Sequence, residues 1–272
     1  MKPDSLSFTK ELQNLPKYKE FERKIASSMT HTSKSMMTHV FSRMRECERI
    51  WKEQKSSIME SLRVLDFSAI EKETANEFSW IPEEIRDSIR TKCNKHLSVL
   101  MSFSEKDIVT ERTFQIFFCV ASTADEHEIH AKIRKVHRWL CFVNKYVDAS
   151  CSKTVNVFLY LIDDKKEMPH EHEVIDKLHV NTAFTTTCQP HTNVHIFREE
   201  EWYRALIHES FHNLGLDFIR MGDTAIAKEE NAIKTVIPVP ISDIRLYETY
   251  CEMWAEILNV AFHVWTTCKS KK

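Results

Sequence analysis

Glycine is almost absent from this chain: two of the 272 residues are glycine, Gly215 and Gly222. The phosphate-binding loops of Rossmann and P-loop proteins need clustered glycines, so both kinds of site are excluded. The nucleophile turn of serine hydrolases, which places a glycine on each side of the serine, is excluded for the same reason. Backbone with positive φ must therefore be rare or use Asn and Asp.

The chain also lacks an excess of charge and a long apolar run. Its 38 basic and 40 acidic residues give a formal net charge of -2, which predicts neither a nucleic-acid nor a membrane-surface partner. No run of 18 apolar residues and no apolar signal-peptide core occur, so no transmembrane helix is expected. The composition is that of an ordinary globular protein.

Paired cysteine motifs are absent as well. The eight cysteines are scattered and none forms a CxxC pair, which excludes a zinc ribbon and a thioredoxin-like motif. Several lie in apolar surroundings, such as Cys119. The pattern predicts buried free thiols rather than a disulfide framework, and hence an intracellular, reducing compartment such as the cytoplasm.

Hydrophobic spacing changes near residue 110. Before it, helical spacing predicts a helix over residues 34–65 and another that starts at Pro82 and runs to about Ser102. The polar residues 104–111 are interpreted as a joint. We therefore expect a helical N-terminal region over residues 1–110 and a second domain over residues 111–272.

The second domain alternates short apolar strands with helices, which predicts an α+β fold. The expected strands cover residues 113–121, 154–162, 180–187 and 194–197, and the expected helices cover residues 126–147, 199–215 and 243–267.

The segment His208-Glu209-Ser210-Phe211-His212 carries the strongest chemical signal. Positions i and i+4 share one face of a helix, so His208 and His212 can hold one Zn²⁺. Glu209 lies beside the metal and can take a proton from the water that the metal activates. Gly215 stands where such a helix needs a left-handed end. The alternative is a surface helix that has two histidines by chance.

A zinc site of this kind needs a third protein ligand. Phe218 stands where the HExxHxxGxxH spacing would put a third histidine, and Asp217 is expected to point elsewhere and hold the turn. Glu248 and Glu252 lie on one stripe of the last helix and form the candidate pair. Glu256 lies on another flank, where solvation is expected.

A helical HExxH followed by a later helical Glu-x-x-x-Glu resembles the gluzincin clan of zinc metallopeptidases. The resemblance implies that Glu248 binds zinc and that Glu252 orients a histidine. Because Glu252 and Glu256 repeat the spacing, Glu252 as the ligand stays open, as does the alternative that all these acids are solvated. Residues 113–262 are also similar to uncharacterised predicted metallopeptidases of large DNA viruses, which implies an infected host cell or a virion as the location.

The resemblance implies a zincin-like, minigluzincin-type fold, one zinc ion per chain and hydrolysis of a peptide or protein substrate. Zincins place an edge strand beside the active-site helix to pair with an extended peptide, and residues 194–197 are the candidate. His195, Tyr247 and Tyr250 are candidate oxyanion donors, none of them assigned. The alternative functions are a catalytically silent zincin-like scaffold that acts as a binding or structural protein, and an amidase with the same metal chemistry.

Two further histidine-rich segments, residues 126–130 and 170–173, lack spacing that fixes a tetrahedral site. Both are interpreted as solvated surface.

Overall fold

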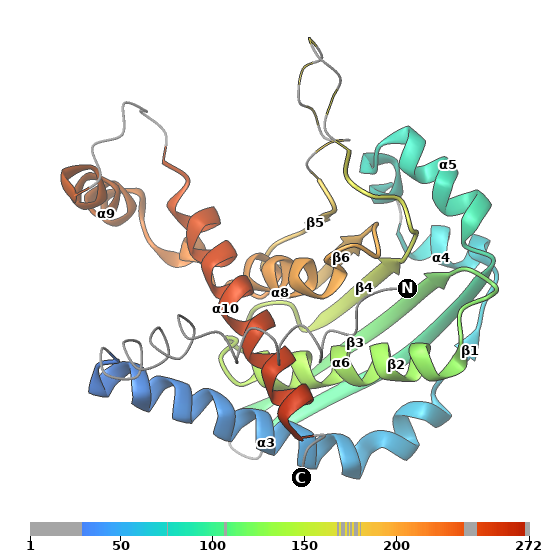
Figure 1. Ribbon diagram of the computed structural model, residues 1–272, viewed down its shortest axis with the longest axis horizontal. Coiled ribbons are helices and arrows are strands. Elements are labelled where there is room, and N and C mark those ends of the chain that lie inside the picture. The colour runs from blue at the N-terminus through green and yellow to red at the C-terminus, as the bar shows by residue number, and fades with distance from the viewer. Residues whose placement is uncertain are drawn as a thin grey trace, which may run out of the picture. The chain divides into compact units, whose positions relative to one another are not determined.

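The computed structural model describes residues 29–74, 76–105, 108–167, 169, 172, 174, 176, 179, 181–236 and 244–269. The chain divides into two compact units, Met1–Arg45 and Glu46–Lys272. Helix α3 (His31–Glu60) begins in the first unit and ends in the second. The sheet and the other described helices belong to the second unit (Figure 1).

A mixed sheet of six strands forms the centre of the second unit, in the order β1-β2-β3-β4-β6-β5. Strands β3, β4 and β6 run parallel, while β1, β2 and β5 pair antiparallel with their neighbours. The strands are β1 (Arg63–Val64), β2 (Lys95–Glu105), β3 (Ile108–Val120), β4 (Thr154–Tyr160), β5 (Ala183–Thr185) and β6 (His191–Ile196). The α+β class expected from the sequence is confirmed.

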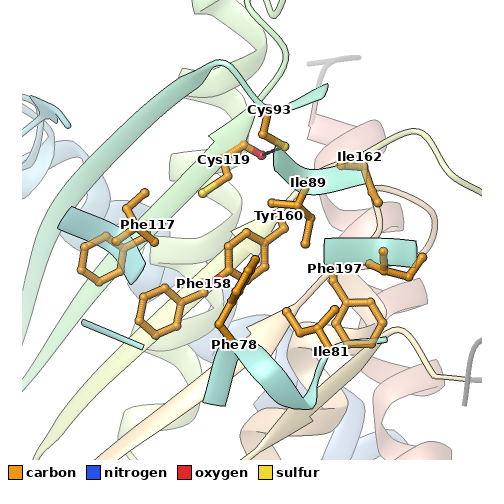
Figure 2. Close-up of a cluster of buried hydrophobic side chains, with 12 residues drawn as sticks. Phe78, Ile81, Ile89, Cys93, Phe117, Cys119, Phe158, Tyr160, Ile162 and Phe197 are labelled. Atoms are coloured by element: carbon orange, nitrogen blue, oxygen red, sulfur yellow. Dashed lines mark hydrogen bonds between the residues drawn. The ribbon is translucent and has the colours of Figure 1, made fainter. Parts of the chain in front are cut away.

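One face of the sheet is covered by short helices. They are α4 (Phe67–Glu73), the 3-10 helix η1 (Glu77–Trp80) and α5 (Glu83–Lys92). Phe78 of η1 and Ile89 of α5 pack with Phe158, Tyr160 and Phe197 in one buried cluster (Figure 2). Because side chains alternate along a strand, Val157 of β4 must point to the opposite face, and it is buried too. Burial on both faces explains the apolar run from Val157 to Tyr160 in β4.

Three longer helices pack together through aromatic side chains. They are α6 (Glu126–Asn144), α8 (Trp202–Asn213) and α10 (Leu246–Lys269). Trp139 of α6 is fully buried, with its ring 6.3 Å from that of Phe211 on α8 and 6.2 Å from that of Phe262 on α10. Its indole N–H donates to the hydroxyl of Ser210 at 2.9 Å. None of the helices in the described ranges is long and apolar enough to cross a membrane.

The expected helical region up to residue 110 is wrong in its last part. Helix α5 ends at Lys92, and the residues predicted to continue it form β2. Leu97, Val99 and Met101 are buried there while Leu100 is exposed, an alternation that belongs to a strand. The predicted joint at residues 104–111 covers the end of β2 and the start of β3, which pair antiparallel. The structure divides the chain at Arg45 instead.

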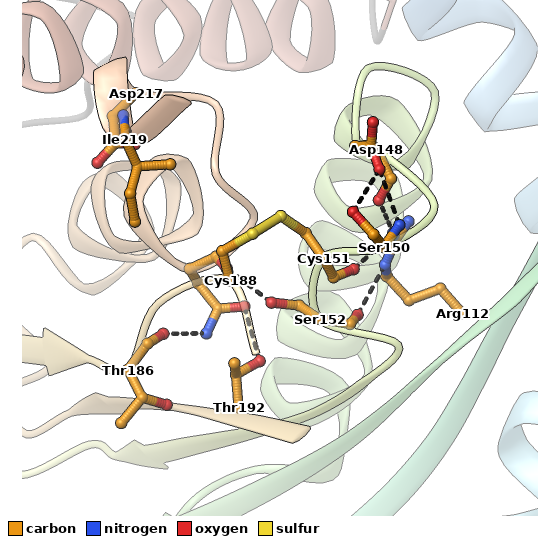
Figure 3. The surroundings of a disulfide bond; sticks show 11 residues. Arg112, Asp148, Ser150, Cys151, Ser152, Thr186, Cys188, Thr192, Asp217 and Ile219 are labelled. Carbon is orange, nitrogen blue, oxygen red and sulfur yellow. Dashed lines mark hydrogen bonds between the residues drawn. A yellow bond between two sulfur atoms is a disulfide. The ribbon is translucent and has the colours of Figure 1, made fainter. Parts of the chain in front are cut away.

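The cysteines follow the expectation only in part. Five described cysteines are buried and form no disulfide, but Cys151 and Cys188 do form one (Figure 3). The prediction of free thiols is therefore wrong for this pair, because the two residues lie 37 positions apart and the fold alone brings them together. The pair also removes the support that free thiols gave to a reducing compartment.

We expect Cys188→Ser to lower the free energy of unfolding by about 2–4 kcal/mol, because the lost bond closes a long loop of the unfolded chain. Urea unfolding of both proteins without reductant measures the difference. With a dithiol reductant present, the two proteins should unfold at the same urea concentration. Equal stability without reductant, or a difference that persists with it, would contradict a stabilising role for the bond.

Candidate metal centre

Helix α8 presents His208 and His212 on one side because residues four apart are neighbours on a helix. The other side of α8 is fixed in the core by Leu206 and Phe211, which are buried. The two imidazole rings lie 5.0 Å apart between centroids. The core packing of α8 therefore determines where the histidines point.

The chain turns sharply at the end of α8 through Gly215, whose φ is +64°. The N–H of Leu216 donates to the carbonyl of Phe211 at 2.8 Å, and the N–H of Gly215 donates to that of His212 at 3.2 Å, which is a Schellman motif. A Cβ at position 215 would lie 2.9 Å from Sγ of Cys151. The left-handed end expected of Gly215 is thus confirmed, and the turn reverses the chain beside the second histidine.

Three donor atoms converge in front of α8. The Nε2 atoms of His208 and His212 lie 3.2 Å apart, and Oε2 of Glu248 lies 3.3 Å from the first and 3.5 Å from the second. Ligands at 2.0–2.1 Å from a tetrahedral Zn²⁺ stand about 3.3 Å from one another. The three side chains could therefore hold one zinc ion and leave a fourth position open.

The opposite ring nitrogens of both histidines face carboxylates. Nδ1 of His208 lies 2.9 Å from Oε2 of Glu252, and Nδ1 of His212 lies 2.8 Å from Oδ2 of Asp217. A carboxylate at Nδ1 keeps the proton there and leaves the lone pair of Nε2 for a metal. Both imidazoles are thus set in the tautomer that a metal ligand needs.

The geometry separates the roles of the two candidate acids of α10. Glu248 faces the Nε2 atoms, whereas Glu252 accepts from Nδ1 of His208 and pairs with Arg204. Glu256 pairs with Arg204 at 3.4 Å and is half exposed. The arrangement matches Glu248 as ligand and Glu252 as the orienting acid, with Glu256 on the periphery.

The position of Asp217 corrects the sequence analysis, which directs its side chain away from the site. That expectation extended helical spacing past the actual end of α8 at Asn213. After the turn, Oδ1 of Asp217 accepts from the backbone N–H of Ile219 at 3.1 Å, starting the 3-10 helix η2 (Phe218–Arg220), while Oδ2 faces His212. Asp217 holds the turn as expected and also orients a ring.

Arg204 and Asn213 were not predicted. Arg204 lies one helical turn before His208 and pairs with Glu201 and Glu252. Its i, i+4 spacing from His208 was the sequence signal that could have placed it beside the site. The amide of Asn213 donates to Oγ1 of Thr185 at 2.9 Å and thereby ties the end of α8 to β5. No sequence signal pointed to this contact, because its partner lies 28 positions away.

The electrostatics of the site suit a bound cation and a nearby base. Burial raises the pKa of Glu209 to about 7; His212 opposes the rise, and Glu248 and Glu252 add to it. Burial lowers the pKa of His212, but the hydrogen bonds to Asp217 and Cys251 and the charges of Cys251 and Glu209 together outweigh it and raise that pKa to about 11, so a metal ion would have to displace the proton on Nε2. The site therefore attracts positive charge, and Glu209 has the proton affinity of a general base near neutral pH.

The donors open into a cleft of about 670 Å³ between α8, α10 and β5. Its far wall is β5, with Thr182, Ala183, Phe184 and Thr185 on the lining. The expected edge strand at residues 194–197 is wrong: β6 lies inside the sheet between β4 and β5, and β5 is the edge. The prediction failed because the more apolar of the two strands, β6, was taken as the edge strand beside the helix.

Of the three candidate oxyanion donors, Tyr247 is among the described residues that line the cleft. His195 is fully buried and its Nε2 lies 2.9 Å from Oε2 of Glu77. The ring of Tyr250 packs against that of Phe218 at 4.8 Å. The geometry leaves Tyr247 as the candidate.

A second donor group, formed by His212, Asp217 and Cys251, lies behind the first. Here Nδ1 of His212 is only 2.8 Å from Asp217, a hydrogen-bond distance that leaves no room for zinc between them. Burial raises the pKa of Cys251, which disfavours the thiolate that a metal requires. The group that faces the cleft is the better metal centre.

Neither metal-binding group found among the described residues includes a histidine of residues 126–130. Three of residues 170–173, namely 170, 171 and 173, lie outside the described residues. His130 is partly exposed and lies 3.7 Å from Glu126 one turn earlier, as expected of a solvated helix surface.

We expect Asp217→Asn to weaken zinc binding by about 10- to 100-fold, because Asn cannot accept from both His212 and the backbone of Ile219. Competition with a chromophoric zinc chelator measures the affinity. Asp223→Asn, a change of an exposed acid at the start of α9 (Asp223–Val236), is the matched control and should leave the affinity unchanged. Unchanged affinity in a folded Asp217→Asn protein would contradict the orienting role.

No protein-family model, curated protein or solved structure matches this chain. The case for the centre therefore rests on the geometry of this chain's own residues.

Proposed function

We propose that this chain is a zinc-dependent peptidase of the gluzincin type, with a zincin-like fold in its second unit. One observation carries the proposal: three donors of His208, His212 and Glu248 stand 3.2–3.5 Å apart at the wall of an open cleft. A purely structural zinc site is normally closed by four protein ligands, whereas this group offers three and faces solvent.

The residues around the three donors have separate roles in the proposed reaction. Zinc would supply the Lewis acid that polarises the peptide carbonyl and makes the attacking water more acidic. Glu209 takes the proton from that water and returns it to the leaving amine. Glu252 and Asp217 hold the rings of His208 and His212 in the required tautomer.

The edge strand suits an extended peptide. The carbonyl of Thr182 accepts from the N–H of Phe197, just after β6, at 2.9 Å, and the N–H of Thr186 donates to the carbonyl of Asn193 on β6 at 3.0 Å. Because such bonds alternate along an antiparallel strand, Ala183 and Thr185 direct their N–H and carbonyl groups toward the free edge. A substrate backbone can pair with these groups as an added strand and pass the donors across the cleft.

Metal removal and a peptide library test the proposal. The zinc-loaded protein should cleave members of a diverse peptide library; a chelator should stop cleavage and added zinc should restore it, as mass spectrometry of the products would show. No cleavage by the zinc-loaded protein would favour the silent scaffold, and release of ammonia without backbone cleavage would favour an amidase.

A further inference from the structure

A row of stacked rings crosses four strands of the sheet. The ring of Phe117 on β3 lies 4.8 Å from that of Phe158 on β4. The ring of His195 on β6 lies 4.6 Å from Phe158 and 4.6 Å from Phe184 on β5. The interplanar angles are 8°, 17° and 16°, so the four rings are nearly parallel.

Strand register produces this row. Phe117 is paired with Phe158, Phe158 with His195, and His195 with Phe184, so all four side chains stand on one face of the sheet. Phe184 is the last because β5 is the edge strand. The next position in the row therefore belongs to whichever strand is added to β5.

Trp80 borders that next position. Its ring lies 5.6 Å from the ring of Phe184, and 56% of the residue is exposed. It is the last residue of η1, which is tied to β6: Oε2 of Glu77 accepts from the amide of Asn193 at 2.9 Å and lies 2.9 Å from Nε2 of the buried His195. An exposed indole held against Phe184, which lines the cleft, is thus positioned before any substrate arrives.

We infer that Trp80 and Phe184 form a subsite for an aromatic side chain of the substrate. The inference rests on the proposed function, in which the substrate pairs with the free edge of β5. The substrate residue opposite Phe184 then projects onto the same face as the row of rings, since directly opposed residues of neighbouring strands share a face.

The chemistry of the position favours an aromatic occupant. Phe184 offers the ring of the adjacent strand and Trp80 offers a second ring at the side, so an incoming aromatic ring meets both. An alanine there would leave most of the indole in water. A carboxylate would lose its water against two rings, and Glu77 of the same 3-10 helix carries a like charge. The subsite therefore selects by ring contact and apolar burial.

The test compares cleavage of a peptide series that carries Phe, Leu, Ala or Asp at each position near the scissile bond. Wild type should prefer Phe at one position, by about 3- to 10-fold in kcat/KM over Ala. Trp80→Ala should lose most of this preference, with zinc content unchanged. Trp80→Phe should keep much of it, and Val64→Ala, a change of an exposed residue on β1, should keep all of it.

The outcomes separate this inference from the proposed function. Cleavage with no aromatic preference at any position, or a preference that Trp80→Ala leaves intact, would overturn the subsite while the peptidase stands. Absence of all cleavage by the zinc-loaded wild type would overturn both.

Discussion

Glu209→Gln is expected to lower the rate of peptide hydrolysis by about 100- to 10,000-fold while zinc stays bound. The side chain keeps its shape but can no longer accept a proton. Its carboxylate lies next to the donors without being one of them, so the metal ligands are untouched. Mass-spectrometric rates on the best library peptide and zinc content of the same samples measure the two effects.

Glu256→Gln is the matched control for Glu209→Gln, because it makes the same change at an exposed acid of α10 that pairs only peripherally with Arg204. It should leave the rate within about twofold, as expected of a surface ion pair. A Glu209→Gln protein that binds zinc and cleaves at the wild-type rate would contradict the general-base role and favour another proton acceptor.

Glu248→Ala is expected to weaken zinc binding by more than about 100-fold, because it would remove one of the three proposed protein ligands. Glu252→Ala should weaken binding by only about 10- to 100-fold, since Glu252 acts through the ring of His208. Competition with a chromophoric chelator gives both affinities, and unfolding curves of the metal-free proteins check that each variant is folded.

The order of these two effects decides between the two assignments of the third ligand. A larger loss with Glu252→Ala than with Glu248→Ala would mean that Glu252 swings to the metal and that the contact of Glu248 with both Nε2 atoms is incidental. Equal and small losses in both would mean that neither acid is a ligand.

The sequence could predict the parts of the site that depend on one helix. His208, Glu209 and His212 lie within five residues, so helical spacing alone places them, and Gly215 marks the end of that helix by its φ. The central strands could also be predicted, because burial on both faces of β4 leaves an apolar run from Val157 to Tyr160.

The remaining parts depend on how separate elements meet, which spacing does not encode. A stripe on α10 carries both Glu248 and Glu252, and only the packing of α10 against α8 distinguishes them. Asp217 reaches His212 because the chain reverses after α8. Helical spacing predicts the direction of a side chain only within the helix, so it could not place Asp217. The edge strand is set by sheet order, and β5 with three residues gives a weaker signal than β6.

The most direct test of the central claim is zinc K-edge X-ray absorption on the purified zinc-loaded protein. The account predicts about one zinc per chain, with nitrogen and oxygen ligands at about 2.0–2.1 Å from His208, His212 and Glu248. A sulfur ligand at about 2.3 Å would place the metal at Cys251 instead and contradict the account, as would a protein that takes up no zinc.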